Sequence, residues 1–204
     1  MAKNVLYVAT GIVHPTIGII RKVRKMLESV EGLAVTRSTS VEGLIKLESD
    51  EFDAVVLMFH RKKISSRALN ALRNFVEGGG GCLAIHAAAA SFKEVPEYEE
   101  LVGGKFVSHD AVHEFTVNPD PNSNVFGDIQ PFTVRDELYV HRYSDDIHVH
   151  AVASNDGGNE PVIWTREWGK GRVCYFSLGH TGKSVAHPAF REVVTRGISR
   201  VLED

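Results

Sequence analysis

The chain has few cysteines and no long apolar run, and both absences narrow the class of protein. Its two cysteines, Cys82 and Cys174, each lie in an apolar, strand-like stretch. That placement predicts buried free thiols and argues against a disulfide framework. No apolar stretch is long enough to span a bilayer, and the first residues carry no apolar signal core. We therefore expect a cytoplasmic protein without a membrane partner.

The chain also lacks a strong charge of either sign. Its 23 lysines and arginines and 26 aspartates and glutamates are mixed along the sequence and give a formal net charge of −3. No basic stripe predicts nucleic-acid binding, and no acidic tail predicts a charged partner. A length of 204 residues, 43% of them hydrophobic, is typical of one sizeable core. We expect a single domain over residues 1–204.

Strand-like and helix-like stretches alternate in the first half of the chain. Apolar runs predict buried strands, and apolar residues three or four apart predict helices between them. The expected strands cover residues 5–10, 35–39, 53–59 and 82–85; the expected helices cover 16–30, a short segment after Ser40 and a segment from Ser65 or Ser66 to Val76. This β-α-β-α order predicts an α/β fold with a parallel sheet and helices on both faces.

The second half of the chain is rich in strands. The expected strands cover residues 105–108, 112–117, 135–143, 147–153, 161–165 and 172–177, with a loop at 118–124 and a closing helix at 188–202. Strands joined by short turns favour mixed or antiparallel pairing. The fold class that we predict is α/β, with a mixed sheet and a β-rich second half.

Histidine is abundant, and one of the ten histidines lies at an informative turn. The glycine run 78–81 precedes the short strand 82–85, and His86 follows that strand directly. In open α/β sheets such a turn often holds a nucleophilic Ser or Cys. An imidazole in this place indicates acid–base, metal or ligand-binding chemistry.

Other histidines also follow expected strands. His14, His60 and His180 follow the strands 5–10, 53–59 and 172–177. Ligands of open α/β sheets bind outside the carboxyl ends of the strands, so these side chains should converge with His86. A single loop histidine is often only a solvated surface residue. That alternative is strongest for His60, which three basic residues follow.

Two histidines four residues apart, His109 and His113, lie in a further strand-like stretch. On one strand their side chains would share a face, which predicts a metal site with imidazole ligands. The alternative is that one is a ligand and the other a surface residue. His148 and His150, beside two aspartates, are interpreted as solvated strand residues.

The expected strand 135–143 carries an acidic pair. Alternation places Glu137, Tyr139 and His141 on one face and Asp136 on the other. Glu137 could orient an imidazole, bind a sugar hydroxyl or act as a general base. The alternative is a charged strand at the edge of the sheet.

Five segments, in this order, resemble the ThuA-like proteins, named for trehalose utilisation. The resemblance covers nearly the whole chain. The segments are the early strand and loop to His14; residues 78–88 with Ile85-His86-Ala87-Ala88; residues 96–109 from Pro96-Glu97-Tyr98 through Gly103-Gly104 to His109; Asp136-Glu137-Leu138-Tyr139; and residues 169–180 from Gly169-Lys170-Gly171 to Gly179-His180.

The resemblance implies a flavodoxin-like, class I glutamine amidotransferase-like three-layer sandwich. Amidotransferases of this class carry a Cys where this chain has His86, and a His that corresponds to His180. Cys82 lies four residues before the turn and cannot replace the missing nucleophile, so amidotransferase activity is not expected. Many relatives also have an acid soon after the Ile-His-Ala-Ala motif, where this chain has residues 89–92, Ala-Ala-Ser-Phe. That departure weakens the transfer of any metal site that needs the acid.

The resemblance also implies a role in carbohydrate utilisation, on trehalose or a keto-sugar. We expect an enzyme, a sugar hydrolase or isomerase, whose partner is a small sugar or sugar derivative and whose cofactor is zinc or another divalent metal. The expected site residues are His86, Glu137 and His180 as catalytic, His14, Tyr139 and His60 as ligand-binding, and His109 and His113 as metal-binding. The alternatives are a non-catalytic sugar- or effector-binding protein and a structural subunit. A homodimer is an expectation from the architecture alone.

Overall fold

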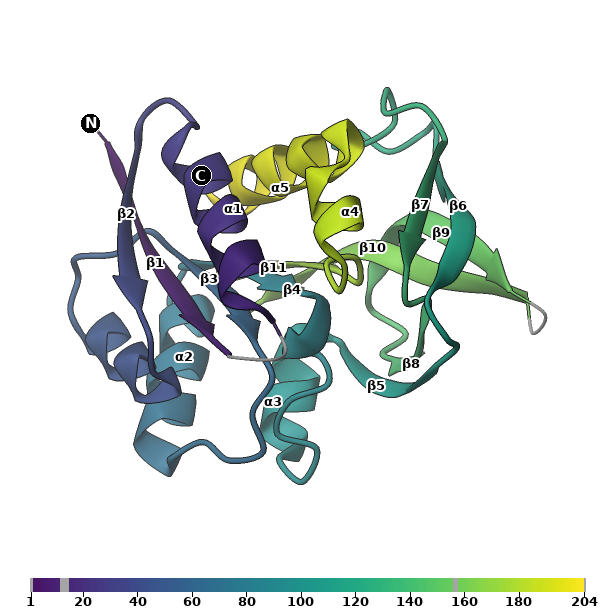
Figure 1. Cartoon of the computed structure of the whole chain (residues 1–204). Helices are drawn as coiled ribbons and strands as arrows, with labels where there is room; N and C mark the ends of the chain where they lie inside the picture. The colour runs from purple at the N-terminus through teal and green to yellow at the C-terminus, as the bar shows by residue number, and fades with distance from the viewer. Residues whose placement is uncertain (1, 12–14, 156–157, 204) are drawn as a thin grey trace.

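The structure is a computed structural model that describes residues 2–11, 15–155 and 158–203 (Figure 1). Its strands are β1 (Lys3–Thr10), β2 (Leu33–Ser38), β3 (Ala54–Phe59), β4 (Gly81–Ile85), β5 (Gly104–His109), β6 (His113–Pro119), β7 (Phe132–Asp136), β8 (Tyr139–Tyr143), β9 (His148–Asn155), β10 (Gly158–Trp168) and β11 (Gly171–Phe176). Its helices are α1 (Ile17–Glu28), η1 (Val41–Glu48), α2 (Ser66–Glu77), η2 (His86–Ala88), α3 (Pro96–Val102), α4 (Gly182–Ala186) and α5 (Pro188–Val201), of which η1 and η2 are 3-10 helices.

A mixed sheet runs through both halves of the chain, in the order β2-β1-β3-β4-β11-β10-β9-β6-β7. The strands from β2 to β11 in this order pair in parallel, and those from β11 to β7 pair antiparallel. The α/β class and the β-rich second half are therefore confirmed. β11 comes late in the sequence but lies beside β4, which brings the ends of these two strands together.

Helices cover both faces of the parallel part of the sheet and give three layers (Figure 1). On one face α1, α4 and α5 pack through Ile20, Val185 and Phe190. On the other face η1, α2 and α3 pack through Leu44, Leu72 and other buried side chains. β3 and β4 are buried along their whole length because both of their faces are covered, which explains their unbroken apolar sequences.

The prediction of one strand over residues 135–143 is wrong: the segment forms two strands, and the break between them lies at the candidate site. β7 ends at Asp136 and belongs to the large sheet, whereas β8 begins at Tyr139 and pairs with β5 in a separate two-stranded sheet. The chain changes sheets at Glu137 and Leu138. The face alternation expected for Asp136, Glu137, Tyr139 and His141 therefore does not apply across this break.

Two further observations concern the apolar parts of the chain. Cys82 and Cys174 are buried and free, as the sequence indicates, and burial raises the pKa of both thiols, to about 12 for Cys174. Within the described residues, no helix has the length and apolar character that crossing a membrane requires.

Candidate functional site

The sharp turn after β4 is occupied by His86. Its φ is 49°, a region that residues with side chains rarely adopt and that is found at functional turns held by their surroundings. The imidazole is 1% exposed and is followed by the small buried residues Ala87 and Ala88. The Tyr175 hydroxyl, on β11, donates a hydrogen bond to the His86 carbonyl oxygen at 3.0 Å. Packing and hydrogen bonding thus support a strained position.

The hydrogen bonds of His86 define which ring nitrogen is available. Nδ1 lies 2.6 Å from the carbonyl oxygen of Ser177. Because a carbonyl oxygen can only accept, Nδ1 carries the proton, and in the neutral form of the ring the lone pair is on Nε2. The Tyr139 hydroxyl lies 3.1 Å from Nε2 and donates to that lone pair in this tautomer. A backbone carbonyl that holds the far nitrogen is a common arrangement for a metal-ligating or basic imidazole.

Glu137 enters the site from the connection between β7 and β8. Its Oε2 lies 3.8 Å from His86 Nε2 and 3.1 Å from His180 Nδ1, and its side chain is 10% exposed. Burial raises the pKa of Glu137, while His180 and His109 oppose the shift and the neighbouring Asp136 adds to it. The carboxylate therefore lies between imidazoles from two different strand ends.

His180 follows β11, and the loop that carries it is bound to the end of β7. The backbone N–H groups of Gly179 and His180 donate to the Asp136 carboxylate at 2.8 and 3.1 Å. Gly179 has a φ of 133°, which glycine adopts without strain. Asp136 is fully buried, and the sequence interpretation placed it away from the site. Its sequence signals are its position beside Glu137 and its place in the segment Asp136-Glu137-Leu138-Tyr139 that resembles ThuA-like proteins.

Tyr139 and His109 form the edge of the same site. The ring of Tyr139 lies 4.4 Å from that of His86 and 5.8 Å from that of His109, between centroids. His109 Nδ1 lies 2.7 Å from the Asp110 carbonyl oxygen and 3.7 Å from Glu137 Oε1, and its side chain is 39% exposed. His109 is thus an exposed imidazole beside the largely buried side chains of His86, Glu137 and Tyr139.

The other predicted site residues lie elsewhere or cannot be placed. His14 lies outside the described residues. His60 directly follows β3, at the expected edge, but is exposed; its partial burial and the nearby Lys93, Arg61 and Lys62 lower its pKa. In the described part of the chain, the residues that could hold a metal ion do not include His60.

The expected pairing of His109 with His113 is wrong. His109 ends β5 and His113 begins β6, so the two histidines lie on strands of different sheets. His113 Nδ1 lies 2.9 Å from the Ala111 carbonyl oxygen, and its ring packs against Phe115. The turn between the strands removes the common face that a continuous strand would have given.

His148 and His150 were both expected to be solvated, and this is wrong for His150. Its ring is 1% exposed and lies between Ser123 Oγ, 2.8 Å from Nδ1, and Thr165 Oγ1, 2.7 Å from Nε2. Burial lowers the pKa of His150 to about 4. The hydroxyls come from distant parts of the sequence, so local polarity did not indicate this burial.

The donor set at the site fits a divalent metal ion. In the described residues, the group able to hold one consists of His86, Glu137 and His180, whose ligand atoms lie within 4.8 Å of one another. Two ligands bonded at about 2.1 Å to one ion lie roughly 3–4 Å apart, and the distances from Glu137 to both imidazoles are in this range. Two imidazoles and one carboxylate suit zinc, iron, manganese or cobalt.

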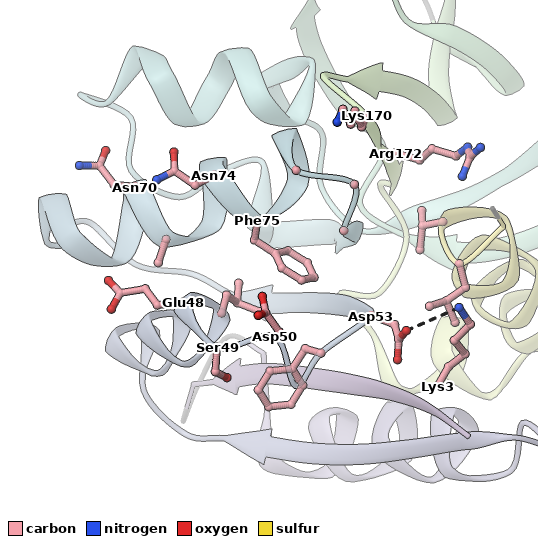
Figure 2. Close-up of a pocket in the computed structure, with 18 of the residues that line it drawn as sticks. Lys3, Glu48, Ser49, Asp50, Asp53, Asn70, Asn74, Phe75, Lys170 and Arg172 are labelled. Carbon is pink, nitrogen blue, oxygen red and sulfur yellow. Dashed lines mark ion pairs between the residues drawn. The ribbon is translucent and has the colours of Figure 1, made fainter. Parts of the chain in front are cut away.

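A hollow of about 970 Å³ lies at the opposite edge of the sheet. Figure 2 shows this amino-edge hollow, which is lined by Lys3, Asp53, Asn74, the turn 78–80, Lys170 and Arg172 among others. The glycine turn is not a phosphate-binding loop, because the N–H groups of Gly78, Gly79 and Gly80 donate to backbone carbonyls of α2. Lys3 pairs with Asp53 at 3.5 Å. These groups of the hollow are therefore occupied by contacts within the fold. None of the predicted site residues that the structure describes lines the hollow.

The three-layer sandwich is consistent with a class I glutamine amidotransferase-like fold, with a histidine in place of a cysteine at the turn after β4. A sequence model of the ThuA family, described as trehalose utilisation, matches residues 4–199. The chain therefore belongs to the ThuA family. No curated protein matches the sequence.

Solved structures with the same fold are also found. A ThuA-like protein from Parabacteroides merdae ATCC 43184 has a TM-score of 0.85 and 19% identity over 98% of this chain and 90% of that one. A cytoplasmic protein from Salmonella typhimurium LT2 has a TM-score of 0.74 and 12% identity over 97% of this chain and 99% of that one. A β-galactosidase from Bacillus circulans matches with a TM-score of 0.66 and 12% identity, over 98% of this chain but 30% of the enzyme. At these identities the likeness shows the fold alone.

Proposed function

We propose that this protein is an enzyme of carbohydrate utilisation that acts on a sugar derivative, such as a keto-sugar, with a divalent metal ion held by His86, Glu137 and His180. One observation carries the proposal. The Ser177 carbonyl holds Nδ1–H of His86, which leaves Nε2 as the possible ligand atom, 3.8 Å from an oxygen of Glu137 that also lies 3.1 Å from His180 Nδ1. The description of the family as trehalose utilisation supports the substrate class.

The neighbouring residues supply the remaining functions that such chemistry needs. A divalent ion in this place would polarise the carbonyl or an adjacent hydroxyl of a keto-sugar. Tyr139 would donate a hydrogen bond to a substrate oxygen, because burial, Glu137 and Asp136 raise the pKa of its phenol and keep it protonated. His109, more exposed than the other groups, would exchange protons with solvent. Hydrolysis and isomerisation of a keto-sugar both suit this set of groups.

Glutamine hydrolysis does not suit the site. It needs a thiolate at the turn, where this chain has His86, and the burial of Cys82 within β4 raises the pKa of its thiol. For the compartment we propose the cytoplasm, as the description of the Salmonella neighbour states for that protein.

Metal binding and turnover test the proposal together. Purified protein is expected to bind about one equivalent of Zn²⁺, Mn²⁺ or Co²⁺ and to convert a keto derivative of trehalose or glucose in a panel of sugars. His86→Ala and His180→Ala should abolish the metal response, measured by calorimetry and by the thermal shift on adding metal. His113→Ala is the matched control, because His113 lies on β6 outside the group, and it should respond as the parent protein does.

Three other outcomes would contradict parts of this proposal. Full metal response of His86→Ala would remove the proposed ligand set. Stabilisation by a sugar without turnover under any metal would indicate a binding protein. No response to metals or to sugars would indicate that the convergence of histidines is incidental.

A further inference from the structure

Asp136 makes contacts that the chemistry proposed above does not yet use. It is fully buried and ends β7, 43 residues before the loop that carries His180. Oδ2 accepts a hydrogen bond from the N–H of Gly179 at 2.8 Å, and Oδ1 accepts from the N–H groups of His180 and Thr181 at 3.1 and 3.3 Å. The Thr181 hydroxyl also donates to the Arg135 carbonyl oxygen at 2.8 Å. Three consecutive N–H groups are therefore bound to one carboxylate.

Glu137, the residue after Asp136, contacts the ring of His180, whereas Asp136 contacts its backbone. Asp136 binds the backbone N–H of His180, while Glu137 Oε2 lies 3.1 Å from the ring Nδ1 of His180. The Glu137 N–H donates to Asp136 Oδ1 at 3.0 Å, which links the two acidic residues directly. One dipeptide thus contacts both the backbone and the ring of a single histidine.

We propose that Asp136 is a positioning residue, whose carboxylate holds the loop 179–181 so that the His180 ring meets Glu137. Its catalytic consequence rests on the function proposed above, but the positioning itself does not. A carboxylate suits this task because it only accepts hydrogen bonds and can take several N–H donors at once. An amide of the same shape would turn an NH₂ group toward one of these donors and leave that donor without a partner.

The test compares Asp136→Asn with the parent protein, first without metal. Amide hydrogen exchange at residues 179–181 should become at least 10-fold faster, and the ring ¹⁵N shifts of His180 should move toward those of a freely averaging imidazole. With Zn²⁺ added, the affinity should fall about 10- to 100-fold, as for other residues that orient metal ligands.

Ser123→Ala is the matched control for lost stability. Ser123 is also a buried side chain whose oxygen accepts backbone N–H groups, from Val125 and Phe126, but it lies outside the group around His86. This variant should lower the melting temperature without changing the His180 ring shifts or the Zn²⁺ affinity. If Asp136→Asn fails to fold, trans-hydrogen-bond couplings between the Asp136 carboxyl carbon and amides 179–181 in the parent protein provide the test, and their absence would overturn the proposal.

The outcomes separate this proposal from the proposed function. If the amides exchange faster in Asp136→Asn while the His180 ring shifts stay unchanged, Asp136 is only structural and the inference is wrong. If the parent protein binds no metal but the ring shifts of Asp136→Asn move as expected, the positioning stands and the metal site fails.

Discussion

The two edges of the parallel sheet differ in the side chains that they bring together, and the volume of a hollow does not reveal this difference. The amino edge carries the hollow of about 970 Å³, whereas the carboxyl edge carries the compact group around His86. At the amino edge, the N–H groups of the glycine turn bind backbone carbonyls and Lys3 pairs with Asp53. At the carboxyl edge, Glu137 faces the imidazoles of His86 and His180, which follow two different strands.

This contrast shows that backbone strain and buried charge are concentrated at the carboxyl edge. His86 has a positive φ, and Glu137 is largely buried, although burial and, to a smaller extent, the neighbouring Asp136 raise its pKa. Strain and buried charge are costly and persist where the surrounding structure supports them, most often at functional sites. A hollow, by contrast, needs neither strain nor buried charge, because a gap between α2 and the glycine turn is enough to produce one. The convergence of titratable groups is therefore the better indicator of function.

The largest expected effect comes from the carboxyl edge. Glu137→Gln keeps the shape of the side chain but removes its charge and basicity, so turnover should fall about 10²- to 10⁴-fold. Asn74→Ala, in the amino-edge hollow, should leave turnover unchanged. Steady-state kinetics on the keto-sugar substrate measure both variants. A large loss in Asn74→Ala would reverse the comparison between the two edges.

Stability should respond strongly at the amino edge. A Cβ on Gly171 would meet the backbone carbonyl oxygens of Val76 and Gly80, which cannot move aside as a flexible side chain could. Gly171→Ala should therefore cost about 1–3 kcal/mol, and each kcal/mol lowers the melting temperature by roughly 2–4 °C in a chain of this size. Calorimetry with and without Zn²⁺ checks the result. The metal affinity of the folded variant should stay unchanged; a changed affinity would show that the two edges are coupled.

Acid should destabilise the protein through histidines that lie outside the site. Burial lowers the pKa of His150 to about 4 and that of His141 to about 3. Between these values and about 6.5 the unfolded chain binds more protons than the folded one, so stability is present at neutral pH and is lost as the pH falls. The melting temperature should therefore decline by several degrees from pH 7 to pH 4.5.

His150→Gln sharpens this prediction. The groups that face His150 include His148 and Arg200, which lower its pKa further, and Asp120, which opposes them. Removal of the imidazole should make the decline of melting temperature with falling pH shallower. His113→Gln, at a half-buried position on β6, should keep the slope of the parent protein. Equal slopes in all three proteins would show that His150 does not carry the effect.

The smallest expected effect is at the rim of the amino-edge hollow. Arg67 pairs with Glu48 at 2.7 Å, and its side chain is 67% exposed. Exposed pairs contribute little and are screened by salt, so Arg67→Ala should change the melting temperature by less than about 2 °C, and less still in 0.5 M salt. Thermal denaturation at two salt concentrations provides the measurement. A large, salt-independent loss would mean that the hollow has a stabilising role that its exposure does not indicate.

The local sequence predicts much of this fold, because helix caps and runs of apolar residues determine where many helices and strands form. Ser65 and Ser40 cap helices as their sequence positions indicate, and Pro188 begins α5. The buried strands β3 and β4 follow from unbroken apolar runs. The parallel order also predicts that histidines after different strands share one edge, which is where His86 and His180 lie.

The remaining features depend on contacts between distant residues, which local patterns do not encode. Asp136 and Glu137 read as alternating residues of one strand, but the chain changes sheets between β7 and β8. Three of the N–H donors of Asp136, those of residues 179–181, lie more than 40 residues away, and no periodicity indicates them. His150 reads as solvated because its hydroxyl partners, Ser123 and Thr165, come from other segments.

The bond from the Tyr139 phenol to Nε2 of His86 also implies a competition. An ion that reaches this nitrogen must first take over the lone pair to which the hydroxyl now donates. Loading with a metal ion would then exchange one partner of Nε2 for another, and the released phenol would change its ultraviolet absorbance. The protein would thus contain its own optical reporter of occupancy, silenced by Tyr139→Phe.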